Sequence, residues 1–377
     1  MTVGSIDNAL EKAGASAYVA YAGSSSPDMM YLTGFQVTDP LVFLKKRGEE
    51  GILVVPQMEY DRALSDCRCG VITRGDAGFF DDLKEHRDGL TATASMISRL
   101  AGGDVLLSPD LPVSLAKRIE SFCRTRVDGG TVADMRSVKT KSEADNIRNV
   151  QKATEEAMQY AISMIKDAES IDGELHLAGV PLTSDYIRGE IHCFFLKRGI
   201  LARDTIVSCG EETSMPHCVG AGTILENEPV VIDLFPCDSK TGYHSDMTRT
   251  VVRGEPDPEI DAMYSCVKEA KRLAEGMVAE GRTGKEVHEF VVDFFDENGY
   301  SSGSEGFMHS LGHGVGLAVH EQPSLSPSGG TLVAGNVITV EPGLYYRGVG
   351  GVRLEDIGMV TKTGFDCFTD YPEDIRI

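Results

Sequence analysis

The feature that most constrains this chain is a glycine-rich run with two histidines at residues 312–323, GHGVGLAVHEQP. Two acidic motifs follow it, VEPG at residues 340–343 and GVRLED at residues 351–356. Two aspartates precede it, each beside a strand-like apolar run. Four carboxylates and one imidazole in such places predict a site for two divalent ions. The expected ligands are Asp233, Asp246, His313, Glu341 and Glu355.

Two turns would bring the four carboxylates together. A turn through residues 238–242 would set Asp233 against Asp246, and a turn through residues 347–351 would set Glu341 against Glu355. Carboxylates crowded in an apolar pocket take up protons unless cations are present. Oxygen-rich ligands with one imidazole favour Mn²⁺, with Co²⁺, Zn²⁺ and Fe²⁺ as alternatives. Two such ions lie roughly 3.5–4 Å apart and share the water that acts as the nucleophile.

The same motifs carry a resemblance. GHGVG, HExP, VEPG and GVRLED, in this order and with the five ligand positions, resemble the motifs of the pita-bread metallopeptidases. Within that family the chain is most similar to the Xaa-Pro branch of aminopeptidase P and prolidase. YLTGF at residues 31–35 resembles a segment of the creatinase-like N-terminal domain, which methionine aminopeptidases lack.

The resemblance implies how the ligands divide. Asp233 would chelate one ion, and Asp246 and Glu355 would bridge both ions. His313 and Glu341 would bind the other ion. Glu341 would also lie near the water and act as general base.

The resemblance also implies roles for further residues. His320 would contact the scissile carbonyl or its oxyanion, and His217 would support the leaving group. His309 would lie near the substrate, and Arg353 would orient Glu355 or other carboxylates. The remaining histidines are expected to be structural: His86, His176, His192, His244 and His288.

The sequence departs from the family pattern in two places. Asp246 lies thirteen positions after Asp233, which is longer than usual, and residues 234–236 replace a customary glycine. A longer hairpin turn costs little, so ligation should survive while the rim of the pocket changes. Ser324 follows HExP, where some dipeptide-cutting relatives carry an arginine.

The glycines around His313 lack the Lys-Ser/Thr of a phosphate loop, so we attribute them to crowding around a metal.

A chain of 377 residues predicts two domains. Residues 1–135 are expected to form an α/β, creatinase/prolidase-like N-terminal domain. Residues 136–377 are expected to form an α+β pita-bread catalytic domain. Apolar runs predict strands at residues 17–21, 41–44, 51–55 and 105–107. Helical patterns cover residues 90–100 and 113–123.

The second part of the chain opens on a helix signal. Ser142 can cap a helix that runs to about residue 166, with an acid three residues later. Residues 167–200 are interpreted as a family-specific insertion that contains a helix at 183–198. Two more helices are predicted over residues 257–279 and 284–298.

Composition limits the partners. A net charge of −22 argues against nucleic acid and against an anionic membrane surface. No run of eighteen apolar residues is present, and the N-terminus lacks a secretory signature, so a cytoplasmic protein is expected. Nine scattered cysteines favour reduced thiols.

The expected activity is that of a dinuclear-metal aminopeptidase that cuts between an N-terminal residue and a following proline. One alternative is a prolidase restricted to Xaa-Pro dipeptides. Another is a non-peptidase hydrolase or lyase on the same fold, acting on a small amidino, N-acyl or sulfonium compound. A non-catalytic binding protein is disfavoured because all five ligands are present. The resemblance also suggests a homodimer.

Overall fold

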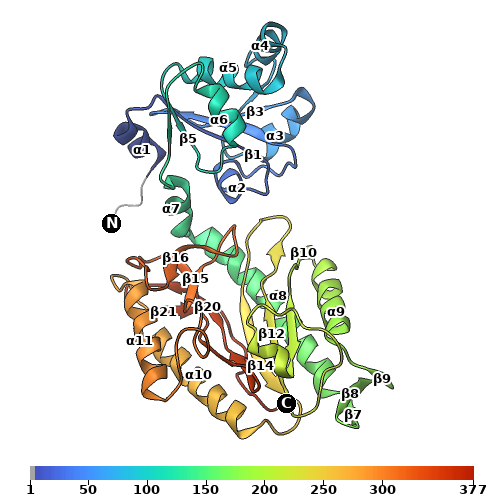
Figure 1. Cartoon of the computed structure of the whole chain (residues 1–377). Helices are drawn as coiled ribbons and strands as arrows, with labels where there is room; N and C mark the ends of the chain where they lie inside the picture. The colour runs from blue at the N-terminus through green and yellow to red at the C-terminus, as the bar shows by residue number, and fades with distance from the viewer. Residues whose placement is uncertain (1–4) are drawn as a thin grey trace. The chain divides into compact units, whose positions relative to one another are not determined.

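The computed structural model describes residues 5–377, and the chain divides into two units, one ending at Arg136 and one spanning Ser137–Ile377 (Figure 1). The first unit holds a mixed sheet in the order β4-β3-β2-β1-β5-β6, in which β2 is antiparallel to both neighbours. Its strands are β1 (Ala17–Ala22), β2 (Leu41–Lys46), β3 (Ile52–Val55), β4 (Gly70–Thr73), β5 (Val105–Leu107) and β6 (Thr125–Val127).

Helices cover both faces of this sheet. Side chains alternate along a strand, so Val19 of β1 packs with α5 and α6 while Tyr18 packs with α1 and α2. The helices are α1 (Ile6–Ala13), α2 (Pro27–Thr33), α3 (Tyr60–Asp66), α4 (Phe79–His86), α5 (Gly89–Ala101), α6 (Val113–Ile119) and α7 (Thr131–Ser137). The strands and helices predicted for this part are present, although the predicted helix over 113–123 ends at Ile119 because the chain then turns into β6.

Two antiparallel sheets form the middle of the second unit. Their orders are β11-β12-β14 and β16-β15-β17-β20-β21. The first sheet contains β11 (Ile206–Cys209), β12 (Pro229–Leu234) and β14 (Met247–Val252). The second contains β15 (Gly312–Gly314), β16 (Glu321–Leu325), β17 (Val337–Val340), β20 (Asp356–Val360) and β21 (Phe365–Cys367). A hairpin of β18 (Gly343–Tyr346) and β19 (Gly350–Arg353) and a short pair of β10 (Ile200–Leu201) and β13 (Cys237–Asp238) complete the centre.

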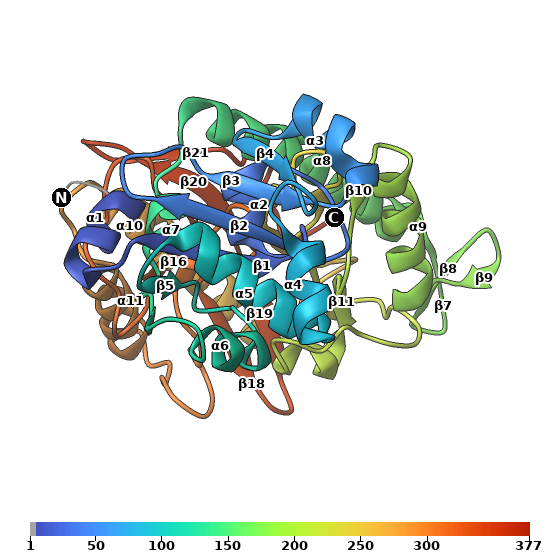
Figure 2. The same ribbon diagram turned by 90° about the horizontal axis from the view of Figure 1, so that it is seen from above.

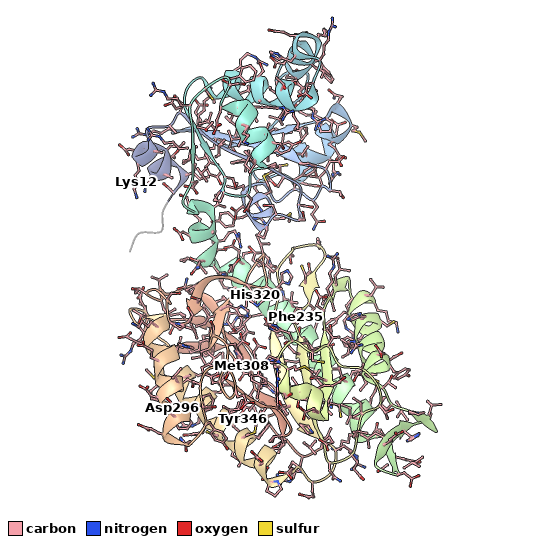
Figure 3. All side chains as sticks on the ribbon, viewed as in Figure 1. Lys12, Phe235, Asp296, Met308, His320 and Tyr346 are labelled. Carbon is pink, nitrogen blue, oxygen red and sulfur yellow. The ribbon has the colours of Figure 1, made fainter. Side chains whose placement is uncertain are left out.

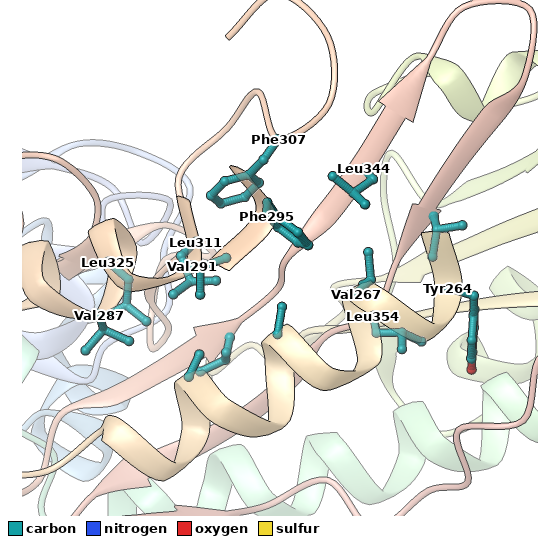
Figure 4. Packing of buried hydrophobic residues seen from close by; sticks show 14 of the residues in the cluster. Tyr264, Val267, Val287, Val291, Phe295, Phe307, Leu311, Leu325, Leu344 and Leu354 are labelled. Carbon is teal, nitrogen blue, oxygen red and sulfur yellow. The ribbon is translucent and has the colours of Figure 1, made fainter. Parts of the chain in front are cut away.

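Four long helices pack against these sheets. They are α8 (Lys141–Lys166), α9 (Ser184–Leu196), α10 (Pro258–Met277) and α11 (Gly284–Glu297). Val230, Ile232 and Leu234 of β12 pack in one cluster with α8 and α9. Leu325 and Leu344 pack in another cluster with α10 and α11 (Figure 4). The helices therefore occupy one face of each sheet, and the opposite faces remain for polar side chains.

The start of α8 differs from the sequence prediction. Its N-cap is Thr140, not Ser142, and Glu143 completes a capping box with it. Both residues are suitable caps, but the first turn begins two residues earlier than the pattern suggests. The helices predicted over 183–198, 257–279 and 284–298 are present as α9, α10 and α11.

The segment predicted to be an insertion has two parts. Its first part forms a small sheet of β7 (Glu169–Ile171), β8 (Glu174–Leu177) and β9 (Val180–Pro181), which projects from the second unit (Figures 1 and 2). Its second part is α9, whose Ile187, Ile191 and Phe195 are buried in the core. No helix in the described part of the chain combines the length and the apolar composition needed to cross a bilayer.

Candidate metal centre

Asp233 and Asp246 come from neighbouring strands. Asp233 lies on β12 between core-facing residues, so the alternation of the strand turns it to the opposite face. β12 pairs with β14 so that Asp233 is opposite Thr248, and Asp246 directly precedes β14. The intervening turn is closed by Asp238, whose Oδ1 accepts hydrogen bonds from two backbone N–H groups at 3.0 and 2.6 Å.

Glu341 and Glu355 occupy equivalent places in the other sheet. Glu341 follows β17 and Glu355 precedes β20, and these strands pair with Val340 opposite Asp356. The β18–β19 hairpin connects them through the turn that the sequence predicts. Both glutamates therefore lie at the same end of the β17–β20 strand pair.

The four carboxylates and His313 meet in the interior. Nε2 of His313 lies 3.2 Å from Oε1 of Glu341 and 3.7 Å from Oδ2 of Asp246. Ligand atoms of Asp246, His313 and Glu355 all lie within 4.8 Å of one another. Oδ1 of Asp233 is buried without a hydrogen-bond partner. Since buried polar atoms are nearly always partnered, this oxygen and the acidic donors around it fit a divalent cation.

The glycines beside His313 lie against the backbone of neighbouring strands. A Cβ on Gly312 would lie 2.2 Å from the backbone oxygen of Thr339, and a Cβ on Gly314 would lie 2.3 Å from that of Gln322. Close approach of the neighbouring strands therefore requires glycine there. The backbone of these strands is sufficient to account for both glycines, without crowding around a metal.

The charges in the site shift one another's titration. Burial raises the pKa of Asp246 and of Glu355 well above the usual carboxyl range, and the neighbouring carboxylates raise both further. Burial opposes the charged form of Glu341 as well, but its hydrogen bond with His313 lowers the pKa of Glu341 to about 2. The same contact raises the pKa of His313 against the effect of burial. Without cations, the site holds protons.

A chain of hydrogen bonds connects Asp233 to His309. Nη2 of Arg353 donates to Oδ2 of Asp233 at 2.6 Å, and its Nη1 donates to the hydroxyl of Tyr345 at 2.9 Å. Nδ1 of His309 lies 2.8 Å from the backbone oxygen of Ser310 and therefore carries the proton. Nε2 then accepts from the Tyr345 hydroxyl at 3.0 Å. Both ring nitrogens of neutral His309 are thus engaged within the protein.

Two residues of this network were missed in the sequence. Tyr345 joins Arg353 to His309, and the hydroxyl of Thr248 donates to Oε2 of Glu355 at 2.7 Å. Strand alternation is the signal that could have found them. Thr248 lies two residues after Asp246, and the β18–β19 register places Tyr345 on the same face as Arg353.

A cavity of about 590 Å³ contains this centre. The apolar residues of its lining include Ile206, Val219 and Phe235. Figure 3 labels Phe235 and His320, which both line the cavity. The predicted site residues that line it are Asp233, Asp246, His313, Glu341, Glu355, His217, His309, His320 and Arg353. The five histidines expected to be structural, His86, His176, His192, His244 and His288, are not among its lining residues.

His320 lies beside the metal-ligand cluster without being part of it. Its ring meets that of His313 edge to face, with 4.2 Å between the centroids. Partial desolvation lowers the pKa of His320, which is an exposed residue, and the neighbouring His313 lowers it further. The imidazole is therefore held mostly neutral near pH 7.

The cavity offers little positive charge. Ser324 lines it, as the sequence suggests, and its hydroxyl lies 2.9 Å from that of Ser326. Of the described residues in the lining, Arg353 is the one permanent cation, and its guanidinium is already bound to Asp233 and Tyr345. A carboxylate on a ligand would meet no free lysine or arginine in this lining.

Comparison with known proteins gives a uniform result. Residues 145–362 match the model of metallopeptidase family M24. The Xaa-Pro dipeptidase of Pyrococcus furiosus is 30% identical over 336 residues, which cover 88% of each chain. The crystal structure of the prolidase from Pyrococcus horikoshii superposes with a TM-score of 0.80 at 27% identity over 98% of each chain. X-Pro aminopeptidase from Thermotoga maritima gives a TM-score of 0.80 at 25% identity, covering 97% of this chain and 99% of that one. The predicted pita-bread fold is confirmed.

Proposed function

The chain belongs to metallopeptidase family M24, and from this premise we propose that it is an aminopeptidase that releases the N-terminal residue from peptides with proline in the second position. The observation that carries the proposal is one cavity that combines four carboxylates with His313, His217 and His320. The carboxylates and His313 suit divalent cations. His217 and His320 offer imidazoles beside them.

The five ligands are proposed to hold two divalent ions, with Mn²⁺ as the preferred metal. Asp233 would bind one ion, His313 and Glu341 would bind the other, and Asp246 and Glu355 would bind both. The unpartnered Oδ1 of Asp233 and the raised pKa values of Asp246 and Glu355 support this assignment. The four oxygen ligands and single nitrogen ligand favour a hard cation over copper.

The residues around the ligands would carry the rest of the reaction. When bound, the ions polarise the scissile carbonyl and make the attacking water acidic. Glu341, a carboxylate at neutral pH, would accept the proton of that water. His320 would donate a hydrogen bond to the oxyanion that develops on the carbonyl. His217 would approach the proline nitrogen, the leaving group.

His309 is proposed to position the site. Its two nitrogens are engaged by Ser310 and Tyr345, so it would hold the Tyr345–Arg353 chain that fixes Asp233. In this role His309 would not itself transfer a proton to or from the substrate, because both of its ring nitrogens are engaged by Ser310 and Tyr345.

Substrate length separates two candidates. The relatives named as Xaa-Pro dipeptidases favour a prolidase. A dipeptide, however, presents its own carboxylate directly after proline, and burying that charge without a cation is costly. The described lining offers no free cation, which favours tripeptides and longer chains. We therefore keep the aminopeptidase as the first candidate.

We extend the proposal to the setting of the enzyme. The first unit would be the creatinase-like N-terminal domain, and the second unit would be the catalytic domain. The protein would act in the cytoplasm as a homodimer on peptides, with neither nucleic acid nor membrane as partner. The net charge of −22 argues against nucleic acid and against an anionic membrane surface as partners.

A hydrolysis panel tests the proposal. The chelator-treated protein is assayed with Xaa-Pro-Xaa peptides and with matched peptides that lack proline, before and after Mn²⁺, Co²⁺ or Zn²⁺ is added. We expect no turnover without metal and release of the N-terminal residue from the proline peptides when metal is restored. Full turnover by a demonstrably metal-free protein would overturn the proposal, as would indifference to proline.

A further inference from the structure

A buried ion pair lies beneath the loop that carries His320. Nζ of Lys139 donates to Oε1 of Glu321 at 2.6 Å, and the two side chains are only 1% and 3% exposed. Glu321 is the residue directly after His320. A charge held this far inside requires its partner, because an uncompensated buried ion is strongly unfavourable. The pair therefore fixes where Glu321 can lie.

Glu321 in turn supports the loop over residues 315–320. It begins β16 and pairs with Gly314 at an irregularity in the ladder. A Cβ on Gly316 would lie 2.4 Å from Oε1 of Glu321, so the carboxylate rests directly against the backbone of Gly316. The oxygen of Gly316 also accepts from the backbone N–H of His244 at 2.8 Å. The carboxylate thus holds one end of the loop against the other.

Lys139 is itself anchored. Its backbone N–H donates to the oxygen of Gly335 at 2.8 Å, and Nδ2 of Asn336 donates to the oxygen of Ser137 at 2.9 Å. The capping box at Thr140 begins α8 immediately afterwards. Lys139 therefore projects from backbone that is fixed on both sides.

The imidazole of His320 has no such anchor of its own. The ring packs edge to face on His313. Within residues 5–377, no hydrogen bond reaches either of its ring nitrogens. Its position must therefore come from its backbone, which is continuous with Glu321.

We propose that Lys139 and Glu321 are positioning residues that place His320 over the reacting carbonyl. This inference rests on the proposed function, because it assigns His320 a contact in the hydrolysis. A displacement of about 1 Å in a catalytic group costs on the order of 10²-fold in rate. Loss of the pair should therefore lower kcat while metal binding and KM change little.

The test uses the full-length, metal-loaded protein. Lys139→Met removes one charge, and Lys139→Met/Glu321→Leu removes both charges together, which buried pairs often tolerate. Lys139→Arg keeps the cation. The matched control is Lys141→Met. Lys141 lies two residues after Lys139 and pairs with Asp145 at the surface, where the two side chains are 88% and 51% exposed. Metal content, kcat and KM on an Xaa-Pro-Xaa peptide are measured for each variant.

We expect kcat to fall about 10²-fold in whichever charge-removing variants fold, to recover in part with Lys139→Arg, and to stay unchanged in Lys141→Met. In a His320→Ala background, loss of the pair should cause no further decrease, because both changes disable one group. Wild-type turnover in a folded, metal-loaded variant would overturn the inference. A multiplicative loss in the His320→Ala background would do so too.

A second measurement separates this inference from the proposed function. The imidazole NMR signal of His320 in the protein loaded with diamagnetic Zn²⁺, identified by its loss in His320→Ala, should shift in the variants without the pair and stay in place in Lys141→Met. If the wild-type protein cleaves no Xaa-Pro peptide, the proposed function fails while this signal still reports the position of the ring. An unchanged signal would reject the positioning role.

Discussion

Nη2 of Arg353 lies 2.6 Å from Oδ2 of Asp233, with both residues buried, while Oδ1 of Asp233 has no hydrogen-bond partner. One oxygen of the carboxylate is thus neutralised by a fixed cation, and the other is left for a ligand. The arrangement orients Asp233 before any ion binds, and Arg353 is the one permanent cation among the described lining residues of the metal-free site.

Arg353→Met should therefore destabilise the metal-free protein strongly. Removing one partner of a buried pair typically costs about 3–5 kcal/mol. Divalent ions should recover part of this loss, because they supply positive charge to Asp233 and bind only the folded chain. Urea unfolding with and without Mn²⁺ measures both effects.

The control for this variant is Arg272→Met. Arg272 pairs with Glu269 on the surface of α10, with side chains 65% and 45% exposed, where such pairs contribute about 0–1 kcal/mol. Equal losses of stability in the two variants would contradict the role of Arg353.

Metal uptake should release protons near neutral pH. Burial and the neighbouring carboxylates raise the pKa of Asp246 and Glu355 in the folded chain, and contact with Glu341 raises that of His313. Ligands must lose these protons before they bind a cation. Calorimetric titration with Mn²⁺ at one pH, in two buffers of different ionisation enthalpy, counts the protons. Heats that do not depend on the buffer would contradict the prediction.

The same shifts set the pH dependence of the metal-free protein. A carboxyl whose pKa is raised by folding keeps its proton in the folded state after the unfolded chain has lost its own. The free energy of unfolding should therefore fall as the pH rises from the usual carboxyl pKa, about 4, towards the raised value. Asp246→Asn removes one such group, so its stability should fall less steeply over that window. Parallel curves for the two proteins would refute the assignment.

Asp246→Ala should lose at least one metal ion per chain, because Asp246 is proposed to bind both ions. Asp238→Asn is the matched control, since Asp238 lies on the same β-hairpin and its Oδ1 caps the turn rather than facing the cavity. Asparagine keeps that acceptor oxygen. Elemental analysis after dialysis decides the matter, and wild-type metal content in Asp246→Ala would reject the bridging role.

His320→Ala should keep its metals and lose turnover. Loss of one hydrogen bond to a developing oxyanion typically lowers kcat about 10²–10³-fold. KM should change little, since the contact forms mainly in the transition state. Near-normal kcat with full metal content would place His320 among the structural residues.

Much of the fold could be predicted because it follows from local patterns. Apolar runs of strand length gave β1, β2, β3 and β5, and helical spacing gave α9, α10 and α11. The N-cap of α8 could not be predicted in this way, because both Thr140 and Ser142 suit the position. Lys139, the residue before the observed cap, is held by Gly335 and Glu321, which are close in space and distant in the chain, and a local pattern does not contain these contacts.

The site also has one part that could be predicted from the sequence and one part that could not. The five ligand positions are carried by short motifs, and strand alternation explains why they face one cavity. The engagement of His309 could not be predicted, because it depends on Tyr345 and on the register of the β18–β19 hairpin. The role of Gly312 was also missed, since the backbone of Thr339 that crowds it lies on another strand.

Substrate length provides the last prediction. A dipeptide such as Ala-Pro would bring its own carboxylate into a cavity that Ser324 lines and whose Arg353 is already bound to Asp233 and Tyr345. An unpaired buried charge is costly, and a bidentate arginine is the usual remedy. Ala-Pro-Ala moves that charge one residue further out, so its kcat/KM should be higher than that of Ala-Pro with the same metal. Ser324→Arg should raise kcat/KM for the dipeptide more than for the tripeptide. A clear preference of the wild-type protein for Ala-Pro would mean that a cation from outside this lining completes the pocket, and would make the protein a prolidase.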